Sequence, residues 1–234
     1  MRDISGFKGA VYSTTELIMR FSIINILWFV INLPISILVL SFYFSNSGNG
    51  IITFLTPLVL LIPALFIPST IAMYATVREW ILKIEQQSLM KVYLSHLKAN
   101  YKKSFLSGLV LMFIWLIWIV DFYFFNKVND LLSIVFLIIG LVLFVYTINF
   151  FSLNVHYKMS IRDMLKNAFF VTMGNPILFC FILMGNLLLF YFSVTEFLFL
   201  FPLFTGSLSA YLSFSAFHRF SLKIKNKALS NKSS

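Results

Sequence analysis

Positive charge alternates with long apolar runs along this chain, and that alternation constrains the fold more than any other feature. All but one of the 18 Lys and Arg residues fall in every second gap between the runs. These basic segments lie within 2–20, 78–103, 158–166 and 219–232, whereas Lys127 occupies an intervening gap. Because cytoplasmic loops of membrane proteins collect Lys and Arg, we predict a multi-pass membrane protein with both termini in the cytoplasm.

The composition also indicates a bilayer environment. Hydrophobic residues make up 60% of the 234 residues and charged residues 11%, which is more apolar surface than one soluble core can bury. The formal net charge of +10 is concentrated in the predicted cytoplasmic segments. There it would attract anionic inner-leaflet lipids at about 1 kcal/mol per basic residue near the surface. We therefore expect the lipid bilayer as a partner and no nucleic acid.

Six apolar runs are long enough to cross the membrane as helices, since about 20 helical residues span the hydrocarbon layer. We place these spans near 21–44, 51–75, 105–126, 131–153, 175–194 and 197–217. The predicted fold is all-α, a polytopic transmembrane helical bundle. Residues 1–234 would form a single integral membrane domain that ends in a basic cytoplasmic tail at 219–234. The outer loops are short, so any function lies within the membrane or on its cytoplasmic side.

Two of the predicted cytoplasmic loops have the periodicity of amphipathic helices. In 88–104, apolar residues recur at steps of three and four, while Lys98 and Lys102 fall on another face. In 160–172, Ser160 and Asp163 have the spacing of a capping box at a helix start. We expect both helices to lie along the inner membrane interface.

Polar residues inside the predicted spans could contact a solute or hold helices together. Asn25 and Asn32 share one helical face, with Trp28 between them one turn from each. For these residues we favour hydrogen bonds between helices over recognition of a solute. Asp121, near the outer end of the third span, is the best charged candidate for contact with an ion or substrate.

Proline is concentrated in the first two predicted spans, at positions that include Pro34 and Pro68. Each proline removes a backbone hydrogen bond and bends its helix. Broken helices can expose carbonyl groups that hold ions or solutes in transporters. Neighbouring helices can also satisfy those carbonyls, and we favour this structural interpretation.

Catalytic chemistry has little support in the sequence. The three histidines, His96, His156 and His218, lack the spacing of metal ligands. There is no Gly-rich phosphate loop followed by Lys and Ser or Thr, and no nucleophile elbow or zinc-protease motif. The one cysteine, Cys180, permits no intrachain disulfide. We predict no enzymatic activity, no metal and no cofactor.

Several short strings resemble the YesL family of bacterial integral membrane proteins. They are Asn25-Ile26-Leu27-Trp28, Leu33-Pro34, Pro68-Ser69-Thr70-Ile71-Ala72-Met73-Tyr74, Val77-Arg78-Glu79-Trp80, Tyr101-Lys102-Lys103-Ser104, Asn154-Val155-His156-Tyr157 and Leu165-Lys166-Asn167-Ala168-Phe169. The resemblance implies a location in the bacterial cell membrane. It implies no particular activity, because none is established for the family. Members of the family typically occur beside genes for the uptake and breakdown of glycans, including binding-protein-dependent sugar importers.

These observations give two sets of candidate residues. Candidates for substrate contact or helix packing are Asn25, Trp28, Asn32, Pro34, Pro68, Thr70, Tyr74 and Asp121. Candidates for docking a partner or lipid are Arg78, Trp80, Lys98, Asn100, Lys102, Lys103, His156, Arg162 and Lys166.

The function that we expect is assistance to carbohydrate uptake, as an accessory subunit or partner of the permease subunits of an ABC sugar importer. One alternative is a small oligomeric carrier or channel, formed by self-association, with Pro68 and Asp121 along its path. Another is a membrane sensor or scaffold that contacts a cytosolic partner through its basic loops.

Overall fold

A computed structural model describes residues 7–44, 51–84 and 88–233, and these residues form helices without any strand. The predicted all-α class is thereby confirmed. In chain order the elements are α1 (Phe7–Ile31), α2 (Leu33–Phe44), α3 (Ile51–Leu61), η1 (Ile62–Phe66), α4 (Ile67–Ile81), α5 (Leu89–Phe125), α6 (Asp130–His156), α7 (Ile161–Gly174), α8 (Pro176–Thr195), η2 (Phe201–Thr205) and α9 (Gly206–Ser233). The two η elements are single turns of π-helix.

Within the described residues, five helical stretches are long and apolar enough to cross a membrane: Thr14–Ile31, Phe54–Ile81, Leu89–Phe125, Asp130–His156 and Pro176–Thr195. They make the chain compatible with a multi-pass membrane protein. The count is one short of the six predicted spans, because no such stretch corresponds to 197–217, and the first stretch has different bounds from its prediction. The predicted span 21–44 is divided at Asn32, just before Pro34, and the predicted span 197–217 is divided between η2 and α9 beside Pro202.

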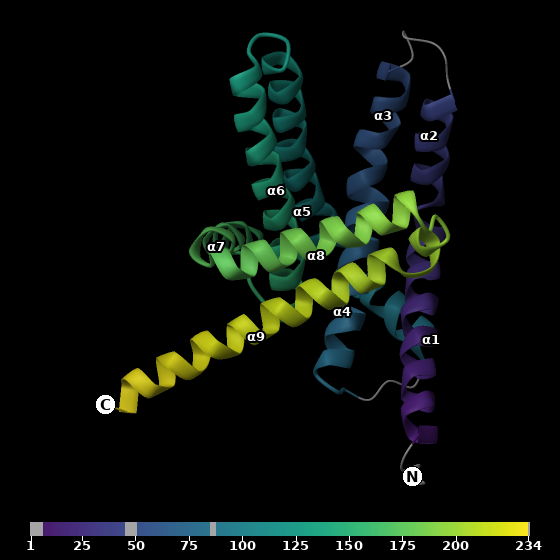
Figure 1. Cartoon of the computed structure of the whole chain (residues 1–234), viewed down its shortest axis with the longest axis vertical. Helices are drawn as coiled ribbons and strands as arrows, with labels where there is room; N and C mark the ends of the chain where they lie inside the picture. Colours follow the sequence, from purple (N-terminus) through teal and green to yellow (C-terminus); the bar gives the residue numbers. More distant parts are fainter. Residues whose placement is uncertain (1–6, 45–50, 85–87, 234) are drawn as a thin grey trace.

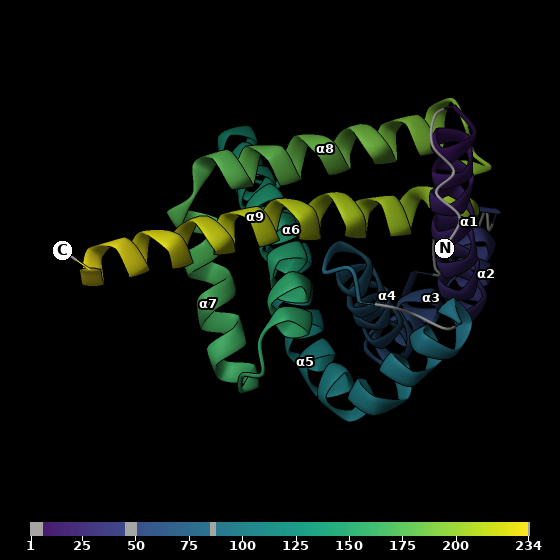
Figure 2. The same cartoon turned by 90° about the horizontal axis from the view of Figure 1, so that it is seen from below.

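The helices form two groups with different directions. Elements α1 to α6 run mainly along the long axis of the molecule, whereas α8 and α9 lie side by side and cross them at a steep angle (Figures 1 and 2). The turn between α5 and α6 lies at the end of the molecule opposite the N-terminal end of α1 (Figure 1). Helix α9 continues through the basic segment, so the predicted tail at 219–234 extends this helix.

Helix α4 forms the centre of the packing. Every residue from Ile67 to Val77 is buried, because α4 contacts α1, α5, α6 and α9. Its side chains Ile71, Met73 and Tyr74 join a core with Trp28 and Phe151. Small residues such as Ala72 and Ser69 let the surrounding helices approach this close, as is usual for helix packing in membranes.

Both segments that we expected to be amphipathic helices are helical, but the bounds of the first differ from the prediction. Residues 89–104 do not form a separate helix, because α5 runs without interruption from Leu89 to Phe125 and curves along its length (Figure 2). Helix α7 is separate and begins as the sequence predicts, with the backbone N–H of Asp163 donating to Ser160 Oγ at 3.2 Å. Their location at a membrane interface remains a prediction.

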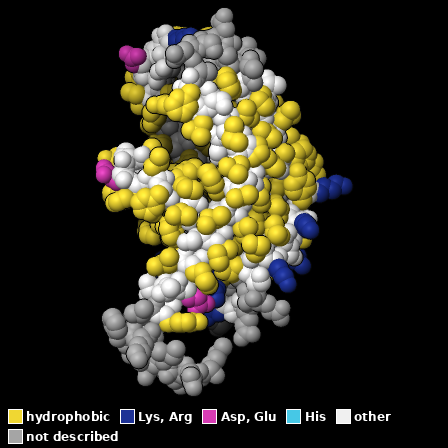
Figure 3. All heavy atoms as spheres, turned by 90° about the vertical axis from the view of Figure 1, so that its right-hand side faces the viewer, with side chains coloured by type: hydrophobic (Ala, Val, Ile, Leu, Met, Phe, Trp, Pro, Cys, Tyr) yellow, Lys and Arg dark blue, Asp and Glu magenta, His cyan; other side chains and the backbone are white. Residues whose placement is uncertain are grey.

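Large apolar side chains cover much of the outer surface. Figure 3 shows them over most of one face, with the charged side chains on that face mainly towards its margins. Examples from several helices are Val30, Ile37, Phe113, Val120 and Ile134, each more than half exposed. Such a surface would be unstable in water but is suited to lipid tails, so it explains how a chain with this composition folds.

Candidate functional site

A layer of buried polar contacts joins α1 to α4. The indole Nε1 of Trp28 donates to Thr70 Oγ1 at 3.0 Å, and the amide Nδ2 of Asn32 donates to Ser69 Oγ at 2.9 Å. All four side chains are buried. The face shared by Asn32 and Trp28 therefore points at α4, where their donors are used to hold two helices together.

Asn25 plays a similar role toward the break before α9. Its Nδ2 donates to the carbonyl of Phe201 at 2.9 Å, and its Oδ1 accepts from the backbone N–H of Ser207 at 2.9 Å. These backbone groups flank η2, where Pro202 interrupts normal helical bonding. At Gly206 the approach is close, since a Cβ atom there would lie 2.9 Å from Asn25 Oδ1.

Tyrosines of α5 satisfy carbonyl groups at the other break, between η1 and α4. The hydroxyl of Tyr101 donates to the carbonyl of Ala64 at 3.2 Å, and that of Tyr93 donates to the carbonyl of Ser69 at 3.1 Å. Gly108 permits the contact, because a Cβ atom there would lie 3.2 Å from the Cα of Pro63. The bend at Pro68 is thus stabilised by a neighbouring helix, as the structural interpretation requires.

Further buried polar pairs connect the later helices. Asn149 Nδ2 donates to Thr172 Oγ1 at 3.0 Å between α6 and α7, and Asn186 Nδ2 donates to Ser213 Oγ at 3.0 Å between α8 and α9. Ser209 donates to the Oδ1 of Asn186. In both pairs an amide inside an apolar helix binds the next helix, although Asn149 Oδ1 has no hydrogen-bond partner among the described residues.

An internal cavity of about 490 Å³ lies between α1, α4, α5, α6 and α9. It brings together the predicted residues Trp28, Thr70 and Tyr74. The other lining residues are mainly apolar and include Ile62, Phe66, Met73, Leu111, Met112, Trp115, Ile119, Phe144, Ile148, Phe151, Phe190 and Phe201. The sequence did not predict that residues of α5 and α6 line this cavity, because their contribution depends on how distant helices pack.

The hydroxyl groups that line this cavity already have protein partners. Thr70 accepts from Trp28, and Thr147 accepts from the indole of Trp115 at 3.1 Å. Thr205 is paired with Ser193, Ser209 with Asn186, and Tyr74 with Ser209 and Ser213. The cavity therefore presents an almost entirely apolar surface to anything inside it.

The other predicted packing residues lie away from the cavity lining. Asp121 is half-buried and lines a separate pocket of about 380 Å³, which Trp118 and Tyr146 also line. Pro68 is buried within α4 and Pro34 is exposed on α2. Asp121 and Pro68 thus do not line one continuous path.

A basic cluster forms where α4, α6 and α9 meet. The rings of His156 and His218 have centroids 5.5 Å apart, and Arg78 is a charged neighbour of His156. Arg78 Nε and the Nδ1 atoms of both histidines are buried without a hydrogen-bond partner among the described residues. The sequence placed Arg78 and His156 in the same candidate set but omitted His218, which follows Phe214 by one turn on the buried face of α9.

The remaining docking candidates are spread over three surfaces. Lys98 and Lys102 are exposed on α5, where half-buried Asn100 donates to the carbonyl of His96 and Lys103 is half-buried. Arg162 and Lys166 are exposed on α7. Trp80 instead packs on α1, with its ring edge-on to Phe21 at 5.7 Å and the Arg20 guanidinium 5.9 Å from its centroid.

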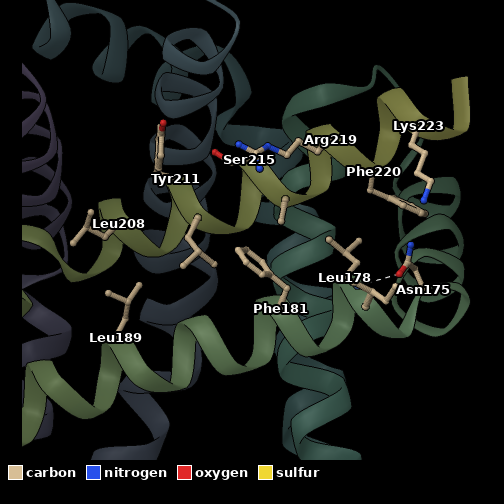
Figure 4. A pocket seen from close by; sticks show the side chains of 13 residues that line it. Asn175, Leu178, Phe181, Leu189, Leu208, Tyr211, Ser215, Arg219, Phe220 and Lys223 are labelled. Atoms are coloured by element: carbon tan, nitrogen blue, oxygen red, sulfur yellow. Dashed lines mark hydrogen bonds between the residues drawn. The ribbon is translucent and has the colours of Figure 1, made fainter. Parts of the chain in front are cut away.

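Helices α8 and α9 enclose a groove of about 610 Å³ that sequence reasoning did not identify (Figure 4). Its α9 side is a stripe at helical spacing: Leu208, Leu212, Ser215, Arg219 and Lys223. The steps of three and four residues in this stripe are visible in the sequence and could have identified this face of the helix. No group of three or more His, Cys, Asp or Glu residues able to hold a metal occurs within the described ranges.

Residues 21–122 match the family described as "Protein of unknown function, DUF624". Over these residues the chain is similar to the DUF624 family. YesL proteins are members of it, so the resemblance found in the sequence is confirmed. The matched part contains both the contacts of α1 with α4 and the break at Pro68, while the similar strings at 154–157 and 165–169 lie outside it. No curated protein and no solved structure shows detectable similarity to the chain.

Proposed function

We propose that this chain is a non-enzymatic protein of the bacterial cell membrane that assists oligosaccharide uptake, as an accessory subunit or partner of an ABC sugar importer. The association with uptake is supported by the genes beside which YesL proteins typically occur. The role as a partner is supported by the character of the internal cavity.

The apolar lining of that cavity is the observation that carries the proposal. A sugar in a binding site needs hydrogen-bonding groups for its hydroxyls, since an unpaired polar group in an apolar site costs several kcal/mol. The hydroxyls of Thr70, Thr147 and Tyr74 are already paired within the protein. This cavity is therefore unsuited to carry an oligosaccharide, and the chain would contribute surfaces to another protein that does.

The topology of the proposal is six crossings with both termini in the cytoplasm. Helices α1 and α2 would make the first crossing together, α3 to α4 the second, and η2 with α9 the last, with α8 and α9 steeply inclined to the earlier crossings (Figure 1). An even number places the basic N-terminal segment and the basic end of α9 on the same side, as the positive-inside rule requires. The basic part of α5 and helix α7 would then lie along the inner face.

Two surfaces are suited to docking on the cytoplasmic side of an importer. On α5, Lys98 and Lys102 are exposed. On α7, Met164, Ala168 and Thr172 are buried against the rest of the protein, while Phe169, Phe170 and Met173 remain exposed beside Arg162 and Lys166. An exposed aromatic patch with a basic rim is typical of a protein interface.

Copurification from native membranes tests the proposal. The tagged chain, extracted in mild detergent from cells grown on several glycans, should retain permease subunits of a sugar importer. Lys98→Glu with Lys102→Glu should reduce this recovery severalfold, whereas Lys225→Glu with Lys227→Glu, an equal charge change on α9, should not. Recovery of the chain alone under every condition would contradict the proposal, and recovery of a soluble partner would favour a sensor or scaffold.

A stand-alone carrier is the second candidate, because the cavity adjoins the broken helix formed by η1 and α4. Liposomes that contain only the purified chain distinguish the two functions. If the chain acts only as a partner of an importer, these liposomes should show no flux of mono- or oligosaccharides. Flux that is abolished by filling the cavity, for example with Ser209→Phe, would instead support the carrier.

A further inference from the structure

The groove between α8 and α9 has two chemically different ends. Its floor and walls are formed by apolar side chains of both helices, including Leu178, Phe181, Leu189, Leu208 and Leu212 (Figure 4). Lys223 and Asn175 lie at the end where α8 begins, and Arg219 lies one turn before Lys223 on α9, with its guanidinium directed back toward Ser215. The groove is therefore amphipathic along its length, with positive charge confined to one end.

The cationic end offers several hydrogen-bond donors and lacks a negative partner. Arg219 and Lys223 are exposed, and neither makes an ion pair with any residue in the described part of the chain. Asn175 caps α8 through its Oδ1, which accepts from the backbone N–H of Leu178 at 3.0 Å. Its amide nitrogen points toward the amine of Lys223 (Figure 4). An acceptor placed between these two donors could bind both of them.

The rim of the groove is suited to lipid. Ile177 is 81% exposed and Phe181 is 55% exposed, and α8 is apolar enough to cross a membrane. A peptide bound in an extended conformation would need partners for its backbone groups, but the apolar part of the groove supplies none. An amphiphile with one anionic head and acyl chains has the same distribution of charge and apolar surface as the groove.

We propose that this groove binds an anionic phospholipid, with its phosphate at Lys223 and Asn175, toward which the exposed Arg219 side chain can turn, and an acyl chain along Phe181, Leu189 and Leu212. The site does not depend on a role in carbohydrate uptake. It predicts selectivity for headgroup charge at one position, in addition to the general attraction of a basic protein to an anionic membrane.

Lipid retention tests the proposal with a matched control. The delipidated protein is equilibrated with mixed micelles of phosphatidylglycerol or phosphatidylcholine, and bound lipid is counted by native mass spectrometry. Phosphatidylglycerol should bind at least about tenfold more tightly, and Arg219→Gln with Lys223→Gln should remove about that preference. Lys225→Gln with Lys227→Gln makes the same charge change on the same helix, outside the groove, and should leave binding within about twofold. Equal losses in the two double variants, or equal retention of both lipids, would overturn the proposal.

Two further arms separate a lipid site from a simple anion site. Ala216→Trp fills the groove while both cations remain, so it should abolish tight phosphatidylglycerol binding. Inorganic phosphate, added at constant ionic strength, should not displace the lipid, because it gains nothing from the apolar groove. Displacement by phosphate, or full binding in the Ala216→Trp protein, would show that the groove does not hold an acyl chain. The exposed positions of Arg219 and Lys223 allow their variants to fold.

Discussion

The hydroxyl of Tyr101 on α5 donates a hydrogen bond to the carbonyl of Ala64, at a distance of 3.2 Å. In an uninterrupted α-helix this carbonyl would accept from the backbone amide at position 68. Pro68 has no N–H, so the side chain of a neighbouring helix takes the place of the missing donor. The bent second apolar run and the long α5 are therefore structurally dependent on each other.

Replacement of Tyr101 tests this dependence. Tyr101→Phe keeps the ring but removes the donor, and should lower the free energy of unfolding by about 1 kcal/mol. Thermal unfolding in detergent measures the change. Tyr43→Phe is the control, since Tyr43 is 80% exposed and the loss of its hydroxyl should have little effect. Equal melting temperatures for the two variants would refute the role of Tyr101.

Asn25 should be more sensitive because it both donates and accepts. Asn25→Leu leaves the carbonyl of Phe201 and the N–H of Ser207 without their side-chain partner, and should cost about 2–3 kcal/mol. Asn25→Asp keeps the acceptor for Ser207, but a buried carboxylate facing the carbonyl of Phe201 is unfavourable, so this variant should also destabilise the protein. The same unfolding assay compares both with Asn226→Leu, a substitution at an exposed site on α9. A melting temperature for Asn25→Leu equal to that of Asn226→Leu would contradict this role.

The contact between Trp28 and Thr70 can be tested by an isosteric change. Thr70→Val leaves the buried indole N–H of Trp28 without its acceptor, so stability should fall by about 1 kcal/mol. Thr195→Val provides the comparison, because Thr195 is exposed and its hydroxyl bonds within its own helix. If both threonine variants unfold at one temperature, the bond contributes nothing measurable.

Membrane sidedness can be measured by cysteine labelling. In a Cys180→Ala background, an impermeant maleimide should label Lys127→Cys in intact cells. Lys98→Cys and Lys223→Cys should react only after the membrane is opened, since the positive-inside rule places them in the cytoplasm. Labelling of Lys98→Cys and Lys223→Cys from opposite sides would rule out the six-crossing topology.

Local sequence patterns predicted which face of α1 carries its polar side chains and where α7 begins. The seven-residue spacing of Asn25 and Asn32 correctly indicated a shared helical face, and the spacing of Ser160 and Asp163 correctly indicated a helix start. The partners of Asn25 could not be predicted, because they lie 176 and 182 residues away. Helical periodicity identifies a face, whereas the neighbour of that face depends on the packing of the whole chain.

The breaks in the helices show a second limit of sequence reasoning. Pro68 indicated a bend, but the π-turn before it and its tyrosine partners depend on α5. Pro202 also divides the last predicted span, although its sequence context is uniformly apolar. Arg219 and Lys223 were recognised as part of a basic tail. Their position beside an apolar groove became evident when α8 was placed against α9.

Helix α5 is unbroken from Leu89 to Phe125, so backbone hydrogen bonds connect its basic segment to the turn with α6 at the far end. A continuous helix of this kind can transmit torque along its curved axis. Any binding event that rotates the helix near Lys98 must also turn its outer end or break hydrogen bonds along the way, and Tyr101 would pull on the bent helix through Ala64. The protein thus contains a mechanical linkage between the basic segment around Lys98 and the turn between α5 and α6.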